Sequence, residues 1–192
     1  VKMAGIGFEL QRVLRRGGLG AMVRVALSGI MIVAGPWLLS IAGIFVIGRF
    51  AAFVLLEGRE LFMGVIIYSY AFSLFLFGGA HYIFTRLISD LIYLDKKRQA
   101  ATALAAFAAL LALASGLIAA AALAGLRADA VSRPGLFKAA SLMFFVAINL
   151  VWLVMIFISL LKRYLAIFLV FLGGMIFSIA ALMVLGRRLA LG

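Results

Sequence analysis

Long apolar runs separated by short polar segments dominate the pattern of this chain. The five runs cover about residues 25–47, 61–84, 100–124, 139–161 and 165–186. Each is close to the roughly 20 residues that an α-helix needs to cross the hydrocarbon core of a bilayer. The pattern therefore predicts an all-α, polytopic integral membrane protein with five transmembrane helices.

Composition points to the same class. Hydrophobic residues make up 68% of the 192 residues and charged residues 12%, whereas a soluble domain is about half apolar and about a quarter charged. A chain of this size cannot hide so much apolar surface from water, so lipid must be its solvent. The chain has no cysteine and one histidine, which excludes disulfides and metal sites built from cysteine or several histidines. We expect no cofactor.

The formal net charge of +12 reflects basic residues that lie almost entirely between the apolar runs. This is the placement of topology signals and lipid-phosphate anchors, so no nucleic acid is expected as a partner. With the N-terminus in the cytoplasm, 11 of the 18 Lys and Arg residues fall inside and 7 outside. Arg187 and Arg188 fall on the outer side against this trend. The odd number of spans, with little sequence after the fifth, leads us to expect part of a longer protein.

Residues 1–24 form a basic segment before the first run, and residues 25–192 form the transmembrane domain. Apolar residues of "IGFELQRVLRR" share one helical face, while Arg12, Arg15 and Arg16 lie mostly elsewhere. This pattern predicts an amphipathic helix on the cytoplasmic leaflet. The segment is interpreted either as a lipid anchor and topology signal or as a docking surface for a cytoplasmic partner.

Two features interrupt the apolar runs. In "SGIMIVAGPWLLS", Gly35 and Pro36 weaken the first helix near mid-membrane. Trp37 and Trp152 lie centrally in their runs, far from the interface where tryptophan is usually found. These residues either pack between helices in the ordinary way, or they form a hinge at Pro36 and an aromatic wall of an internal cavity. In the alanine-rich third run, Gly116, Ala120 and Ala124 recur every fourth position, which predicts a close helix contact.

Polar groups inside the runs are few, and no carboxylate lies deep in any of them. A proton or sodium relay of a coupled antiporter is therefore not visible. Asn149 is interpreted as an interhelical hydrogen-bonding group or as part of a substrate path. His81, about one turn inside the cytoplasmic interface, is either a packing residue or a titrating one. The runs contain no paired carboxylates, and the sequence has no HExxH, GxSxG or phosphate loop, so we expect no enzyme activity.

The second run ends in the stretch "GGAHYIFTRLISDLIYLDKKR", residues 78–98, where the sequence turns polar. A cluster of four residues lies at this cytoplasmic end: Thr85, Arg86, Ser89 and Asp90. Arg86 and Asp90 are four residues apart, so they share a face and can pair. The pair is either part of a gate or an ordinary salt bridge at a helix end, worth a few tenths of a kcal/mol.

Three stretches in this order, "MAGIGFELQRVLRR", "GPWLLSIAGI" and "GGAHYIFTRLISDLIY", resemble the PelG family. This family is the inner-membrane subunit of Pel exopolysaccharide secretion and a distant branch of the multidrug, oligosaccharidyl-lipid and polysaccharide flippase superfamily. The resemblance covers most of residues 3–98 and continues as hydropathy to residue 192. It implies about twelve helices in two bundles around a central path, of which this chain holds most of the first.

The resemblance implies export of a cationic amino-sugar polymer of the biofilm matrix across the bacterial inner membrane. It also implies that the cluster of Thr85, Arg86, Ser89 and Asp90 stabilises an inward-facing gate. The implied partners are membrane lipids, the nascent polysaccharide, other Pel membrane subunits and a cytoplasmic glycosyltransferase. Two alternatives remain open: a flippase for lipid-linked oligosaccharide, and a membrane scaffold that docks the glycosyltransferase and transports nothing.

Overall fold

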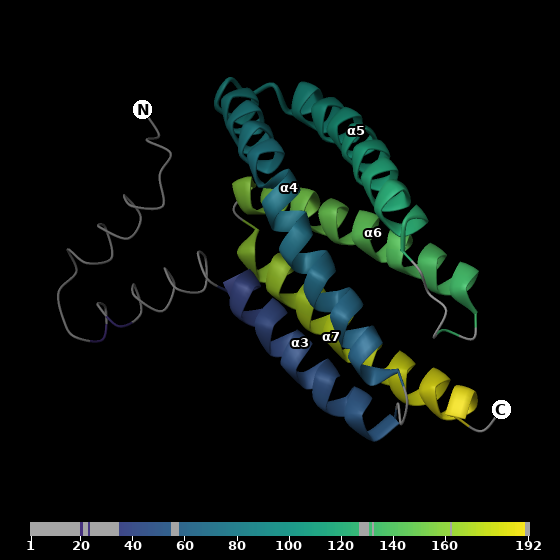
Figure 1. The fold of residues 1–192 in the computed structure, drawn as a ribbon. Helices are drawn as coiled ribbons and strands as arrows, with labels where there is room; N and C mark the ends of the chain where they lie inside the picture. Colours follow the sequence, from purple (N-terminus) through teal and green to yellow (C-terminus); the bar gives the residue numbers. More distant parts are fainter. Residues whose placement is uncertain are drawn as a thin grey trace. The chain divides into compact units, whose positions relative to one another are not determined.

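The chain is helical throughout the part that the structure describes, in agreement with the hydropathy pattern. The computed structural model describes residues 20, 23, 35–54, 58–126, 131, 133–161 and 163–190. Five helices have their bounds there (Figure 1): α3 (Gly35–Val54), α4 (Arg59–Tyr93), α5 (Lys97–Ala124), α6 (Pro134–Leu160) and α7 (Tyr164–Ala190). Helices α4 to α7 each contain a stretch long and apolar enough to cross a membrane. The predicted class, a multi-pass helical membrane protein, is confirmed.

Helices α4 to α7 are longer than the apolar runs that predict them. Helix α4 continues past residue 84 to Tyr93, and α6 begins at Pro134 rather than near residue 139. Proline suits the first turn of a helix because its missing N–H has no partner there in any helix. In α3 the apolar stretch Ser40–Ala52 is shorter than a full span. Residues 25–34 of the expected first span lie outside the described residues, as does the basic N-terminal segment apart from residues 20 and 23.

The helices divide between two compact units, one with α3 and α7 and the other with α4, α5 and α6. In the first unit, α3 and α7 pack through small residues. Gly43 is buried, and a Cβ added to it would lie 3.8 Å from the Met175 sulfur. Ser40 and Ala51 are also buried on α3, as is Ile167 on α7. Small residues at helical spacing let two backbones approach closely, as they commonly do in membranes.

The second unit has an apolar core shared by α4, α5 and α6. Its buried members are Phe77, Phe84, Ile88, Ala100, Leu111, Ala119, Phe145 and Leu153. The rings of Phe84 and Phe107 are 5.0 Å apart between centroids, and those of Phe77 and Phe145 are 6.2 Å apart. Both are favourable separations for aromatic pairs. These contacts hold α4 against both of its neighbours.

The packed face of α5 differs from the predicted one. Leu111, Ser115 and Ala119 are buried, whereas Ala120 and Ala124 are exposed, so the predicted small-residue face is wrong at these two positions. Of the predicted residues, Gly116 does approach α6, since an added Cβ would lie 3.8 Å from Val146. Leu111, Ser115 and Ala119 occupy the contact with the neighbouring helices, and a helix turns about 100° per residue. Their burial turns Ala120 and Ala124 outward.

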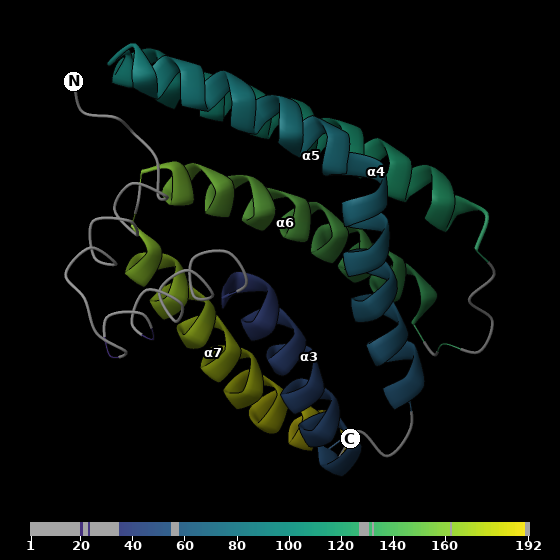
Figure 2. The same ribbon diagram turned by 90° about the vertical axis from the view of Figure 1, so that its left-hand side faces the viewer.

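Helix α4 is a single helix of 35 residues, about 52 Å long at 1.5 Å per residue. Figure 2 shows that its first half and its second half run in different directions. The central part contains the adjacent glycines Gly78 and Gly79, and glycine pairs are a common cause of helix kinks. A Cβ added at either glycine would meet nothing within 4 Å. The bend therefore does not depend on close packing at these glycines.

A tight turn of three residues joins α4 to α5. Asp95 adopts a left-handed backbone conformation with φ 56°, and the Lys96 N–H donates to the Leu91 carbonyl at 2.9 Å. Aspartate is among the few residues that enter this region at modest cost. The turn brings the polar end of α4 next to the basic start of α5, where Lys97 pairs with Asp95 at 3.1 Å.

Candidate functional site

The buried face of α4 is partly polar. Ser69, Ser73 and His81 recur at intervals of four and eight residues, so they lie on one side of the helix, and all three are buried. On α6, Ser141 and Asn149 are buried as well. In a bilayer, polar side chains turn toward the protein interior because lipid offers them no partner. The interface of α4 and α6 is therefore the candidate functional site of this unit.

Ser73 and Asn149 are joined by a hydrogen bond at the centre of this interface. The Ser73 hydroxyl donates to Asn149 Oδ1 at 2.9 Å, and Asn149 Nδ2 donates to the Phe145 carbonyl at 2.8 Å. Both side chains are fully buried. The amide of Asn149 thus donates along its own helix and accepts from α4. This arrangement fixes which turn of α4 lies against which turn of α6.

His81 lies two turns beyond Ser73 on the same face, with 6% of its surface exposed. The backbone of Asn149 faces the imidazole as a hydrogen-bond partner. The other ring nitrogen, Nε2, is buried and has no hydrogen-bond partner among the described residues. Buried polar atoms are nearly always paired. This nitrogen is therefore an unsatisfied acceptor or donor at the interface of α4 and α6.

Trp152 is buried beside Asn149, at the same interface. Its ring meets Tyr70 of α4 edge to face, with 6.1 Å between centroids and an interplanar angle of 90°. This is a favoured aromatic geometry. Trp152 therefore packs against α4 through this ring contact.

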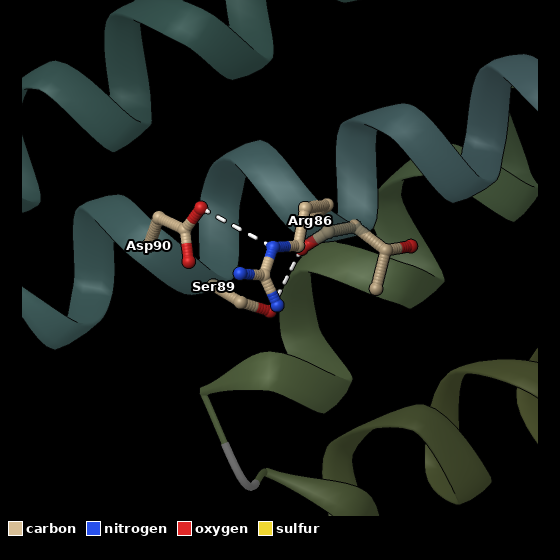
Figure 3. A network of polar contacts seen from close by, with 4 residues as sticks. Arg86, Ser89 and Asp90 are labelled. Carbon is tan, nitrogen blue, oxygen red and sulfur yellow. Dashed lines mark hydrogen bonds and ion pairs between the residues drawn. The ribbon is translucent and has the colours of Figure 1, made fainter.

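At the end of α4, Arg86 and Asp90 form the ion pair that their spacing permits (Figure 3). Arg86 Nε lies 3.4 Å from Asp90 Oδ2, and the two side chains are 76% and 57% exposed. The Ser89 hydroxyl donates to the Thr85 carbonyl, and the Thr85 hydroxyl donates to the His81 carbonyl, both at 2.7 Å. These two hydroxyl-to-backbone bonds lie on the turns of α4 between the buried His81 and the exposed ion pair.

The structure brings His81, Asn149 and Trp152 together at one interface and places the Thr85–Asp90 cluster on the next turns of α4. Gly35 and Pro36 begin α3 in the other unit. The side chain of Trp37 and the residues Arg12, Arg15 and Arg16 lie outside the described part of the chain. The sequence interpretation did not pair Ser73 with Asn149 or Tyr70 with Trp152. The spacing of Ser69, Ser73 and His81 on one face was the available signal.

The chemistry that this interface offers is hydrogen bonding. Within the described ranges, no three His, Cys, Asp or Glu side chains gather in a way that could hold a metal ion. The buried polar groups of the interface are hydroxyls, one amide, one imidazole and the indole N–H of Trp152. Hydroxyl-rich molecules are bound by groups of this kind, each of which donates or accepts.

Comparison with known proteins identifies one family. The sequence model of the PelG family, described as "Putative exopolysaccharide Exporter (EPS-E)", matches residues 3–191. Neither the curated proteins nor the solved structures contain a match to this chain.

Proposed function

Because the chain belongs to the PelG family of exopolysaccharide exporters, we propose that it moves a cationic amino-sugar polymer of the Pel type across the bacterial inner membrane. The observation that carries the proposal is the family match over nearly the whole chain. The described helices are compatible with it, since four are long and apolar enough to cross a membrane. In this proposal the chain is a transporter and catalyses no reaction, and the polymer supplies part of a biofilm matrix.

In this proposal the interface of α4 and α6 is a joint between moving helices. Its polar contacts are few, with Ser73 and Asn149 at the centre and His81 at one end. A contact made of single hydrogen bonds between helices is worth about 0.6 kcal/mol in membrane proteins. Such an interface is specific in register yet can be separated, which a transporter that rocks between two arrangements requires.

The Thr85–Asp90 cluster is the proposed cytoplasmic gate. Arg86 and Asp90 are exposed in the described arrangement, so both can exchange their partner without first leaving a buried site. An exposed pair contributes little to stability. In this proposal the role of the pair is to determine which charged or polar groups come into contact when the cytoplasmic side closes. The hinge assigned to Gly35 and Pro36 belongs to the same proposal.

The proposed partners are membrane lipids, the nascent polymer, other Pel membrane subunits and a cytoplasmic glycosyltransferase. The N-terminal residues Arg12, Arg15 and Arg16 are the proposed contact with lipid phosphate or with that enzyme, by charge attraction. The N-terminus lies in the cytoplasm in this arrangement.

The proposal is tested by deleting the gene in a cell that makes the polymer and measuring hexosamine in three fractions: culture medium, cell lysate and lipid extract. Loss of polymer from the medium with continued synthesis inside the cell is the expected result. Accumulation of lipid-linked oligosaccharide instead would favour the flippase. Unchanged export would contradict the proposal outright.

The scaffold alternative is separated by variants in the deleted strain. A scaffold tolerates Asn149→Leu but fails when Arg12, Arg15 and Arg16 are all replaced by Gln. A transporter shows the opposite sensitivity, with export falling for Asn149→Leu while the glycosyltransferase stays bound to the membrane. The amount of each variant in the membrane, measured by immunoblot, is the control.

A further inference from the structure

The outer side of α4 carries aromatic side chains. Tyr68, Phe72, Phe75 and Tyr82 follow one another at intervals of four, three and seven residues, which places them on one helical face. All four are exposed, Phe75 at 83% and Tyr82 at 75%. We call these four residues the α4 aromatic face. It lies on the side of α4 opposite to Ser73 and His81, which face α6.

The exposed side of α4 combines these aromatic rings with aliphatic groups such as Leu76 and Ile83, whereas the neighbouring helix α5 exposes aliphatic groups alone among its large side chains. On α5 the large exposed side chains within the helix are Leu110, Leu113, Leu117 and Ile118. Branched aliphatic groups on a transmembrane helix are suited to contact with lipid tails. Helices α4 and α5 belong to the same unit, so the difference between their exposed faces indicates different surroundings.

The α4 aromatic face also carries polar groups where lipid would offer them no partner. Tyr68 is 66% exposed and lies less than about 10 Å along the helix from the middle of the expected span 61–84. Interfacial tyrosines belong at the headgroups, about 15 Å from the bilayer centre. A phenol hydroxyl in the hydrocarbon core carries a desolvation cost. One turn after Tyr82, the exposed Arg86–Asp90 pair continues the same face.

A sugar chain has the chemistry that this face matches. A pyranose ring has apolar C–H faces, which stack on aromatic rings, and a rim of hydroxyl groups, which hydrogen-bond to phenol, guanidinium and carboxylate groups. The Tyr68 and Phe72 rings lie 6.3 Å apart between centroids with planes inclined by 31°. One helical turn rises about 5.4 Å, which is comparable to the length of one sugar unit. An amino group on the sugar is also attracted to Asp90.

We propose that the α4 aromatic face binds the polysaccharide chain as it is exported, with Arg86 and Asp90 at the cytoplasmic end of this contact. The proposal rests on the proposed function and adds to it the surface that the polymer touches. Stacking on apolar sugar faces holds the chain laterally without a deep binding site. Because each ring contributes modestly, the polymer can advance from one ring to the next.

Photocrosslinking in polymer-producing cells tests this directly, using the full-length protein expressed from its own gene. The photoreactive residue p-benzoylphenylalanine replaces Phe75 or Tyr82, both exposed aromatic positions. Leu113 on α5 receives the same residue as the matched control. After illumination, the purified protein is digested, and its adducts are identified by mass spectrometry and by hexosamine analysis.

Hexosamine-containing adducts at positions 75 and 82, with lipid adducts at 113, are expected. Lipid adducts at all three positions would overturn the inference. So would adducts at 75 and 82 to another protein or to a further part of the same chain. If deletion of the gene removes export while these adducts contain no sugar, the inference alone fails. If deletion leaves export unchanged, the proposed function itself fails.

Substitution supplies a second readout. Phe75→Leu and Tyr82→Leu keep an apolar side chain on an exposed surface, so folding is preserved, and each is expected to lower export about two- to tenfold. Phe177→Leu on α7 is the matched control, because Phe177 is an aromatic residue 74% exposed elsewhere in the chain. Its export should stay at the wild-type rate. Equal loss in all three variants, or none in any, would contradict the inference.

Discussion

Asn149 illustrates how much one side chain contributes to the packing of this unit. Its oxygen accepts from Ser73 on α4 while its amide nitrogen donates within α6, and neither side chain is exposed. Removing one partner leaves a buried polar group unpaired, which costs more than the bond itself contributes. Removing both partners together avoids this cost. The pair is therefore expected to behave as a coupled unit.

Single substitutions Asn149→Leu and Ser73→Ala should each destabilise the protein, Asn149→Leu by about 1–3 kcal/mol. The double variant should be less destabilised than the sum, with a coupling of about 0.6–1.7 kcal/mol. Unfolding by SDS titration in mixed micelles measures all four forms of the cycle. Strict additivity would mean that the hydrogen bond is absent in the protein in lipid or detergent.

Arg86 and Asp90 give a prediction in which stability and activity separate. Arg86→Gln or Asp90→Asn should change the free energy of unfolding by less than about 0.5 kcal/mol, because the pair is exposed. If the pair belongs to the gate, export should nevertheless fall in each single variant. The exchanged pair, Arg86→Asp with Asp90→Arg, should recover part of it. Normal export in the single variants would reduce the pair to a surface salt bridge.

At the scale of the element, α4 departs most from a simple span. It runs beyond its apolar stretch, bends, and carries polar groups on its buried face and aromatic rings on its exposed face. Its central glycines, Gly78 and Gly79, have open space around them. Alanine at either position is therefore sterically allowed and raises helix propensity, by about 1 kcal/mol in an exposed helix interior.

The double variant Gly78→Ala/Gly79→Ala should keep or increase thermal stability while lowering the rate of export, because it stiffens the segment that bends. Gly173→Ala in α7 is a suitable control, since an added Cβ there also meets nothing within 4 Å. Thermal unfolding in detergent and hexosamine in the medium are the two measurements. A loss of stability would show that the bend, rather than a straight helix, is the more stable form.

Helix α4 starts directly after Gly58, whose backbone has φ 80°. A Cβ added there would meet no atom within 4 Å, so only the backbone conformation favours glycine. Gly58→Ala should therefore destabilise the unit by about 1–2 kcal/mol, for conformational reasons alone. Gly135→Ala, with equally open surroundings near the start of α6, should leave stability unchanged or slightly raised. Comparison of the two unfolding midpoints in SDS titration tests the assignment. Equal effects would contradict it.

At the scale of the whole molecule, the absence of cysteine from the sequence allows a clean test of orientation. Asp95→Cys lies in the turn between α4 and α5, and Arg133→Cys lies just before α6. With the N-terminus in the cytoplasm, an impermeant maleimide should label position 133 in intact spheroplasts and position 95 only after permeabilisation. The reverse pattern would show that the distribution of Lys and Arg misled the assignment.

The sequence by itself determined the class of the protein, the approximate positions of its four long apolar helices and the pairing of Arg86 with Asp90. Hydropathy over some 20 residues and spacing by four are local properties that lipid and helix geometry translate directly into structure. The stretches with MAGIGFEL and TRLISD also indicated the family, and the match over residues 3–191 confirms it. In these cases neighbouring residues in the chain contain the whole signal.

Only the tertiary structure decided which faces meet. The bond between Ser73 and Asn149 joins residues 76 positions apart, and nothing local in either helix specifies the other. The contact face of α5 was mispredicted for the same reason: alanine fits equally well against a helix or against lipid, so its spacing alone could not select a side. The aromatic rings of α4 became informative only once their exposure was known. Packing between helices depends on two surfaces together, whereas the sequence of one helix describes only the surface of that helix.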